Sequence, residues 1–363
     1  MIMMDPKKTI SFEGAICPVP LSHNERIVLG HGSGGKMSQD LISRLFLPAF
    51  DNPILRAGND AGVFQNASGL RIAMCTDSHV VLPLFFPGGD IGKLAICGTV
   101  NDLAMMGATP AWLTAGFILE EGLEISILER VIQSMRSVAE EARIQIAAGD
   151  TKVVQKGKAD GLYINTSGVG ILESGIFIGG EQAKPGDLVI VSGDIGDHGI
   201  AVLSARGDLG FQANVESDIA PLNQLVSEMI AAGTDEAGSH IHVLRDPTRG
   251  GLATTLNEIA RQSSVAILIN ENQIPVKPEV TAACELLGFD PLYIANEGKL
   301  IVIVDRTYAD RVLHEMKRNK YGKNAAIIGQ VQQAPQGRVL MRTTIGSTRI
   351  VDVLTGEMLP RIC

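Results

Sequence analysis

Four aspartates stand where the hydrophobic pattern predicts strand ends or the buried face of a helix. Asp60, Asp77 and Asp150 each follow or precede an apolar run, and Asp102 falls on the apolar row of a helical pattern over residues 91–106. An unpaired buried carboxylate costs several kcal/mol, so a cation such as Mg²⁺, which prefers hard oxygen ligands, is the expected partner. Each aspartate taken alone could instead be a turn or capping residue. Together the four predict a metal site that handles nucleotide phosphates.

Two glycine-rich loops could bind the phosphates themselves. Residues 30–36 read Gly-His-Gly-Ser-Gly-Gly-Lys and precede a helical pattern over residues 37–46, so the loop can direct backbone N–H groups toward an anion. This loop lacks the spacing of a Walker A motif, and taken alone it could be a flexible turn. Residues 245–251, Arg-Asp-Pro-Thr-Arg-Gly-Gly, follow a strand-like run and open a helix at Leu252. The two glycines of this second loop permit close approach to an anion.

Other polar clusters and one cysteine complete the candidates. His198, in Asp-His-Gly, and Glu297, in Asn-Glu-Gly-Lys, stand at the edges of expected elements. His198 could equally be a polar residue at a helix entry. The five cysteines include no CxxC pair, and Cys75 and Cys97 lie in apolar stretches where a small buried side chain is expected. Cys363 is the last residue, too near the end for prenylation, and is either accidental or a thiol placed on a free end.

Strand-like and helix-like runs alternate along the chain, which predicts an α/β fold that positions these groups. Strands are expected at 70–75, 112–119, 144–148, 162–169, 188–192, 265–269, 300–304 and 325–331, and helices at 91–106, 125–142, 219–232, 252–262 and 308–317. A Lys-Pro-Gly-Asp turn at 184–187 predicts a domain boundary near residue 180. We therefore expect an N-terminal extension with the first glycine-rich loop, two α/β domains, and a C-terminal segment with a mobile tail; their bounds are 1–45, 46–180, 181–333 and 334–363.

The composition excludes several functional classes. A length of 363 residues with 45% hydrophobic and 20% charged residues predicts a globular chain of about two domains. The formal net charge of −9 disfavours nucleic acid or an anionic membrane surface as the main partner. No apolar run approaches the ~18 residues of a membrane span, and charges interrupt residues 1–21, where a secretory signal needs an apolar core. We expect a cytoplasmic protein with no nucleic-acid or membrane partner.

Several segments together resemble the HypE family of hydrogenase maturation factors. The resemblance covers essentially the whole chain, and its most specific part is the ending Pro-Arg-Ile-Cys at 360–363. The other matching segments are 32–35 (Gly-Ser-Gly-Gly), 76–79 (Thr-Asp-Ser-His), 98–108 (Gly-Thr-Val-Asn-Asp-Leu-Ala-Met-Met-Gly-Ala), 149–154 (Gly-Asp-Thr-Lys-Val-Val) and 246–251 (Asp-Pro-Thr-Arg-Gly-Gly). One departure is Asn59-Asp60, where relatives often carry two adjacent aspartates.

The resemblance implies a homodimeric, two-domain PurM-like enzyme of the superfamily of aminoimidazole ribonucleotide synthetase, selenophosphate synthetase and thiamine monophosphate kinase. Such enzymes place Mg-ATP between an N-terminal and a C-terminal α/β domain. In this family the carbamoyltransferase HypF loads a carbamoyl group onto the terminal cysteine, and ATP drives its dehydration to a thiocyanate. The cyanide then passes to iron on the HypC–HypD complex for the nickel-iron hydrogenase.

The resemblance also implies roles for individual residues. The expected catalytic residues are Cys363 as acceptor, Lys152 beside the phosphoryl group or carbamoyl oxygen, Glu297 as base and His198 as the second candidate for that base. The expected metal ligands are Asp60, Asp77, Asp102, Asp150 and Asp246. The residues expected to contact ATP are Gly32, Ser33, Gly34, Gly35, Thr76, Asn101, Gly149, Thr151, Arg249 and Gly250.

Two alternatives remain open. A selenophosphate synthetase-like enzyme would need a reactive cysteine beside a Gly and Lys motif, whereas Cys17 is followed by Pro-Val-Pro. A non-catalytic carrier would only present Cys363 to other proteins. Because this cysteine must visit two active sites, we expect its tail to lie outward in the unmodified protein and inward once it is carbamoylated with Mg-ATP bound.

Overall fold

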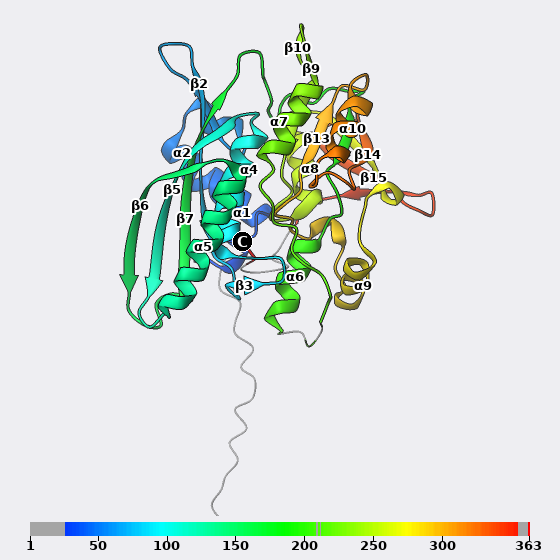
Figure 1. Cartoon of the computed structure of the whole chain (residues 1–363). Coiled ribbons are helices and arrows are strands. Elements are labelled where there is room, and N and C mark those ends of the chain that lie inside the picture. Colours follow the sequence, from blue (N-terminus) through cyan, green and yellow to red (C-terminus); the bar gives the residue numbers. More distant parts are fainter. Residues whose placement is uncertain (1–25, 208–209, 211, 355–361) are drawn as a thin grey trace, which may run out of the picture.

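The computed structural model describes residues 26–207, 210, 212–354 and 362–363, which form two α/β domains. Every expected strand is present, and the helix expected over 125–142 has those bounds. The helix expected over 219–232 begins only at Asn223, because Pro221 lacks an N–H and disfavours helical backbone in the residue before it. The two domains stand side by side, with helix α4 between them (Figure 1).

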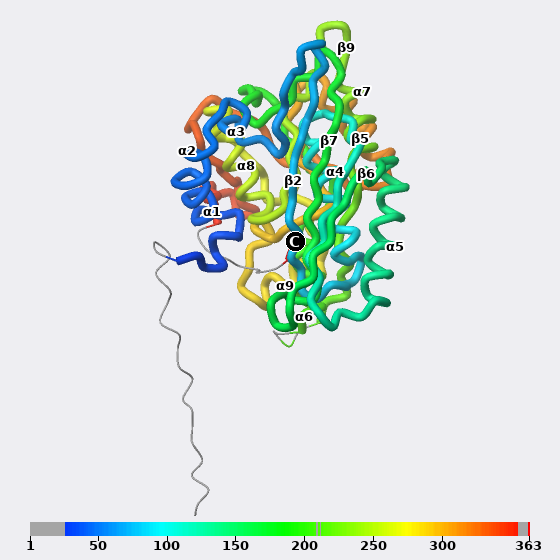
Figure 2. Tube along the Cα trace, turned by 90° about the vertical axis from the view of Figure 1, so that its left-hand side faces the viewer, coloured from blue at the N-terminus to red at the C-terminus, as the bar shows by residue number. Residues whose placement is uncertain are grey.

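The N-terminal domain is built on a five-stranded, mainly antiparallel sheet. Its strands lie in the order β1 (Gly62–Gln65), β2 (Arg71–His79), β7 (Leu162–Leu172), β5 (Thr109–Glu120) and β6 (Gln145–Val154). Helices α4 (Ile91–Met105) and α5 (Ile125–Ala142) cover one face (Figures 1 and 2). Nearly every residue of the edge strand β6 is exposed.

The C-terminal domain contains a seven-stranded sheet. Its strands lie in the order β11 (Ile241–Arg245), β13 (Ile301–Val304), β8 (Leu188–Val191), β14 (Ala326–Gln332), β12 (Ala266–Asn270), β15 (Arg338–Arg342) and β16 (Thr348–Val351). The central strands are continuous Val and Ile runs because both faces are covered. Helix α8 (Gly251–Gln262) packs on one face, and α7 (Asn223–Ala232) and α10 (Ala309–Arg318) pack on the other.

Shorter elements complete the two domains. They are η1 (Leu29–Gly32), α1 (Lys36–Leu41), the π-helical turn η2 (Ile42–Phe46), α2 (Leu47–Phe50), α3 (Pro53–Ala57), β3 (Phe85–Phe86), β4 (Gly89–Asp90), α6 (Asp197–Arg206), β9 (Thr234–Asp235), β10 (Gly238–Ser239), η3 (Glu271–Gln273), α9 (Pro278–Leu287) and η4 (Pro291–Tyr293). Helix α1 reaches the C-terminal domain, where Lys36 N–H donates to Leu354 O (2.9 Å) and Gln39 Nε2 to Glu258 Oε1 (3.1 Å). The first glycine-rich loop is thereby held beside α8 (Figure 2).

Helix α4 of the N-terminal domain also packs against the C-terminal domain. Ala104 and Met105, at its C-terminal end, pack into a cluster with Leu225 of α7 and Leu244 of β11. This packing places the C-terminal turn of α4, which contains Asp102, at the domain junction. In the described part of the chain, no helix is long and apolar enough to cross a bilayer.

Candidate active site between the two domains

Four of the five aspartates expected to bind metal come together at the domain junction. Asp60 precedes β1, Asp77 lies in β2, Asp102 lies in α4 and Asp246 follows β11. Burial, with charge repulsion from the neighbouring aspartates, raises the pKa of Asp102 and Asp246 well above the usual range. The neighbouring charges that raise the pKa of Asp102 are those of Asp77, Asp246 and Asp60. Carboxylates that repel one another in a buried site are stabilised by a cation.

Arg245 holds the first of these carboxylates. Its Nη1 donates to Asp60 Oδ1 at 2.6 Å, and both side chains are almost fully buried. Burial still raises the pKa of Asp60, although the charge of Arg245 opposes the shift. The neighbouring Asn59 accepts a hydrogen bond from Gly180 N–H (2.9 Å) and so ties this segment to the one that leads into the C-terminal domain.

The chemistry of these donors fits Mg²⁺. All four ligands would be carboxylate oxygens, and Asp60 Oδ2 is buried without a hydrogen-bond partner. Among the described residues, no three Asp, Glu, His or Cys side chains already converge as a metal site. Mg²⁺ commonly takes one or two carboxylates and completes its shell with substrate phosphates and water. The cluster therefore suits a cation that arrives with a nucleotide.

The first glycine-rich loop lies against Arg249. Arg249 Nη1 donates to Gly32 O (3.0 Å), and Gly34 has a positive φ of 74° with Arg249 Cβ only 3.0 Å from where its own Cβ would be. The expected open phosphate cradle is absent from the described loop: the N–H groups of Gly34 and Gly35 donate to the hydroxyls of Ser38 and Ser33. These hydroxyls must turn away before phosphate oxygens can take their place.

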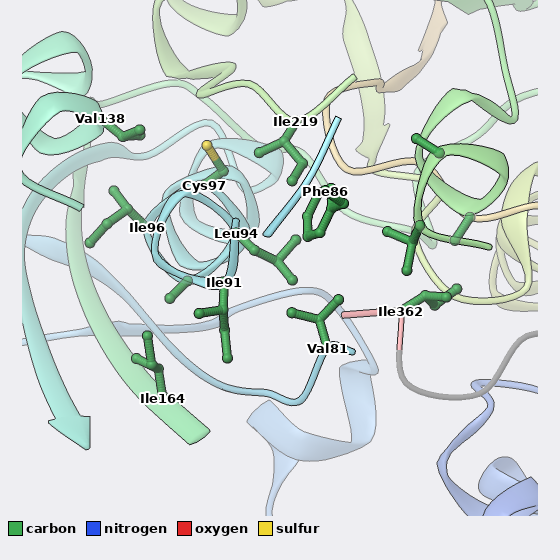
Figure 3. Packing of buried hydrophobic residues seen from close by; sticks show 14 of the residues in the cluster. Val81, Phe86, Ile91, Leu94, Ile96, Cys97, Val138, Ile164, Ile219 and Ile362 are labelled. Carbon is green, nitrogen blue, oxygen red and sulfur yellow. The ribbon is translucent and has the colours of Figure 1, made fainter. Parts of the chain in front are cut away.

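The last two residues lie inside this site, which corrects the outward position expected for the unmodified chain. Ile362 pairs with Val81 and packs against Val81 and Phe86 (Figure 3), and Val80 N–H donates to Cys363 O at 3.0 Å. Apolar burial at the domain junction stabilises this position without any modification of the sulfur. The mobile tail expected before these residues falls largely on 355–361, outside the described residues.

Charged groups from both domains surround the sulfur. Burial raises the pKa of the Cys363 thiol to about 12; Arg249 opposes the shift, and Glu297 and Asp77 add to it. Glu297 is buried, and its Oε1 has no hydrogen-bond partner. Burial, followed by the charges of Asp246 and Asp218, raises the pKa of Glu297 well above its usual range. The Cys363 thiol is thus subject to the charge of one guanidinium and of two carboxyl groups.

His198 and Asn101 have other partners than those expected. Both nitrogens of the buried His198 ring are engaged, with Ser217 Oγ at 2.8 Å and Ile362 O at 2.6 Å, so the ring has no free nitrogen to act as a base. Asn101 accepts from Leu222 N–H and donates to Ala220 O, which commits its amide to the domain junction instead of a nucleotide.

The remaining expected residues lie on the sheet, away from the aspartate cluster. Asp150 and Lys152 pair with each other on β6 at 2.6 Å, and both side chains are 69% exposed. Gly149 and Thr151 share this strand, three strands from Asp77 in β2, or ~14 Å at the usual strand spacing. Within one chain, these four residues do not join the other site residues.

Thr76 and Gly250 have local roles in the described structure. Thr76 Oγ1 donates to Thr166 O (3.1 Å) in the adjacent strand. Gly250 has a positive φ of 78° and precedes α8, where a Cβ would lie 2.3 Å from Thr254 Oγ1. Glycine is therefore required for this turn, which places Asp246 and Arg249 at the site.

Comparison with known proteins identifies the family. A family model described as AIR synthase related protein, N-terminal domain, matches residues 58–172, and the corresponding C-terminal domain matches residues 184–342. Carbamoyl dehydratase HypE of Cupriavidus necator is 52% identical over 338 residues, 93% of this chain and 95% of that protein. Its namesake from Escherichia coli (strain K12) is 45% identical and covers 93% of this chain and 99% of its own. The chain belongs to the HypE family of carbamoyl dehydratases.

Solved structures of HypE proteins confirm the two-domain PurM-like fold. A HypE–HypF complex matches with a TM-score of 0.81 at 50% identity, covering 86% of this chain and 99% of that chain. A HypE structure in complex with ATP matches with a TM-score of 0.77 at 49% identity, covering 93% and 100%. Thiamine monophosphate kinase from Aquifex aeolicus, at 20% identity and a TM-score of 0.59, shares the fold alone. The domain bounds expected from the sequence stay predictions.

Sequence reasoning assigned no role to Arg245 or Ser217. Arg245 is a fully charged residue at the end of the apolar strand β11, and a buried position of this kind predicts a paired carboxylate. Ser217 lies in an irregular segment, and its contact with His198 depends on tertiary structure alone. The ion pair of Arg245 could have been predicted from the hydrophobic pattern of the strand, whereas the contact of Ser217 with His198 could not.

Proposed function

We propose that this enzyme uses ATP to dehydrate an S-carbamoyl group on Cys363 to an S-cyano group. The carbamoyl oxygen attacks the γ-phosphorus of ATP and ADP leaves. Loss of the two nitrogen protons and cleavage of the C–O bond then give the nitrile and inorganic phosphate, so the oxygen of the lost water ends in phosphate. The observation that carries this proposal is the inward position of Cys363 among Arg249, Glu297 and Asp77.

The aspartate cluster would hold Mg-ATP. Asp60, Asp77, Asp102 and Asp246 offer oxygens at the domain junction, and Asp60 Oδ2 has no other partner. The ion supplies charge neutralisation for the transferring phosphoryl group. The HypE structure with ATP supports nucleotide binding. If Arg249 contacts the phosphates, the loop of residues 32–35 would also lie near them, because the Arg249 guanidinium donates a hydrogen bond to Gly32 O.

Glu297 is our candidate to accept a nitrogen proton. Its raised pKa suits a group that takes up a proton near neutral pH, because the proton is then held strongly. The positive charge of Arg249 opposes this rise of the Glu297 pKa in part. Among the described residues whose charges act on Cys363, Glu297 also has a buried carboxyl oxygen without a hydrogen-bond partner.

We propose that a second copy of the chain supplies Asp150, Lys152, Gly149 and Thr151. Strand β1 pairs only with Arg71–Met74 of β2, so no described strand pairs with the outer edge of β2 beside Asp77. The outer edge of β6 is likewise free of described partners. Pairing β6 of one copy with this part of β2 in another would close the sheets and bring Lys152 to the aspartate cluster.

The uncovered face of this sheet supports the same homodimer. Helices α4 and α5 cover its other face, while Met74, Trp112 and Ile118 on the open face are 52%, 48% and 43% exposed. Large apolar side chains gathered on one sheet face mark a protein interface. A second copy of the chain would cover this face and would also supply the β6 residues that complete the site.

The other partners follow from the proposed chemistry. A HypF-type carbamoyltransferase would load Cys363, and the HypE–HypF complex supports this assignment. A HypC–HypD complex would accept the cyanide for iron of a nickel-iron hydrogenase. The location would be cytoplasmic, with no nucleic-acid or membrane partner.

Intact mass spectrometry tests the proposed function. The protein is incubated with the carbamoyltransferase until Cys363 is carbamoylated, and Mg-ATP is then added to the repurified product. We expect the mass to fall by one water, with one ADP and one phosphate formed. The Cys363→Ser variant should gain no carbamoyl group. A carbamoylated mass that persists despite bound Mg-ATP would instead support the carrier alternative.

A further inference from the structure

Backbone hydrogen bonds hold the C-terminal end of the chain, and the Cys363 side chain also packs against the cluster that contains Ile362. His198 Nε2 lies 2.6 Å from Ile362 O, and Val80 N–H donates to Cys363 O at 3.0 Å. Ile362 also forms an antiparallel bridge with Val81, and its side chain is 6% exposed. Neither the two hydrogen bonds nor the bridge involves the sulfur atom.

The hydrogen bonds of His198 define the tautomer of its neutral ring. A carbonyl oxygen only accepts, so Nε2 must carry a proton to bind Ile362 O. Ser217 Oγ, which already accepts from Ile219 N–H at 3.3 Å, has its hydroxyl proton free to donate to Nδ1 at 2.8 Å. The buried ring also lies edge-on to Phe86, with 5.6 Å between centroids. Burial lowers the pKa of His198 and so favours the neutral ring, although the charge of Asp218 opposes the shift, and the two hydrogen bonds fix the ring's orientation.

We propose that His198, oriented by Ser217, and the backbone N–H of Val80 form a latch that sets the register of residues 362–363 whatever group the sulfur carries. This inference deepens the proposed function and rests on it for its catalytic meaning. The thiol, carbamoyl and cyano forms of Cys363 then dock with the same backbone geometry. His198 is a positioning residue in this scheme, and the sulfur substituent alone changes during the reaction.

This latch explains how one site can serve successive forms of one residue. The charges of Arg249 and Glu297 act on the sulfur atom. The two groups that hold the backbone, the Val80 N–H and the neutral His198 ring, carry no charge. A change at sulfur therefore leaves both anchors intact. Release of the tail to a partner requires breaking two hydrogen bonds and exposing Ile362, a modest cost for a reversible step.

Alkylation of Cys363 measures release of the latch without ATP or a carbamoyl group. The protein is treated with iodoacetamide, and the modified C-terminal peptide is quantified by mass spectrometry. His198→Phe keeps an aromatic ring beside Phe86 but removes the donor, and we expect about tenfold faster alkylation. His198→Gln restores an amide N–H and should stay within about threefold of wild type. His314→Phe, on the exposed side of α10, should leave the rate unchanged.

Nitrogen NMR of labelled histidine provides a test that needs no variant. We expect one neutral His198 tautomer with the proton on Nε2, and the same signature after Cys363 is chemically cyanylated to the proposed product. A proton on Nδ1, a signature lost on cyanylation, or wild-type alkylation in His198→Phe would overturn the latch. Neither measurement uses the dehydration reaction, so these results leave the proposed function standing and are distinguishable from its failure.

Discussion

Mixed dimers of two inactive variants provide a direct test of whether the site is shared between chains. Asp102 lies in the aspartate cluster, whereas Lys152 lies on β6, three strands from β2. That separation is ~14 Å at a strand spacing of ~4.8 Å, beyond the reach of a lysine side chain of the same chain. If β6 of a partner supplies Lys152, each site combines Asp102 of one copy with Lys152 of the other.

The expected magnitude follows from counting sites. Asp102→Asn and Lys152→Ala should each reduce ATP-dependent dehydration by about a hundredfold or more, because each removes charge stabilisation of the phosphoryl group. In a dimer with one copy of each variant, one site carries both lesions and the other carries neither. We therefore expect about half of wild-type turnover. The dimers are co-expressed with two different tags and purified through both, and dehydration is followed by intact mass.

A matched pair of variants separates this arrangement from general stabilisation. Asp102 and Glu297 come from the same copy, because both act on the group around Asp77 within one chain. Mixed dimers of Asp102→Asn with Glu297→Gln should hence carry one lesion in every site and remain inactive. Equal turnover in the two kinds of mixed dimer, or no recovery with Lys152→Ala, would refute the shared site.

Three further changes test the charges of the site. Asp102→Asn should raise the melting temperature at pH 7 in EDTA by a few °C. Burial raises the Asp102 pKa, so the wild-type protein loses stability as pH rises through that value, whereas the amide variant does not. Calorimetry at pH 5 and pH 7 tests this, and an equal change of melting temperature with pH in the two proteins would show that it is wrong. Arg245→Met should cost about 3–5 kcal/mol in denaturant unfolding, because Asp60 keeps a buried charge without its partner, whereas Arg136→Met on an exposed pair should cost under ~1 kcal/mol. Equal costs would contradict the buried-pair reasoning. Glu297→Gln should permit carbamoylation yet block loss of water, and wild-type dehydration by this variant would remove Glu297 from the base role.

Local sequence predicted the elements well because periodicity reports which residues are buried. The helix over 125–142 follows an amphipathic period, and the Val and Ile runs of the C-terminal sheet indicate strands covered on both faces. The start of α7 differs because Pro221 excludes helix where apolar periodicity continues. The functional residues depended more on motif resemblance, since a single aspartate or glycine has several local interpretations.

The sequence by itself determined the α/β class, the family resemblance and the set of acidic residues around which the site is built. Tertiary structure alone decided which of them meet: Asp60 and Asp246 are 186 positions apart, yet the charge of Asp60 raises the pKa of Asp246 across the domain junction. It also assigned the amide of Asn101 to the junction, gave His198 to the backbone of Ile362, and left Asp150 on an exposed edge. The physical reason is that a hydrogen bond or ion pair depends on distance in space, which chain position does not specify until the domains have packed.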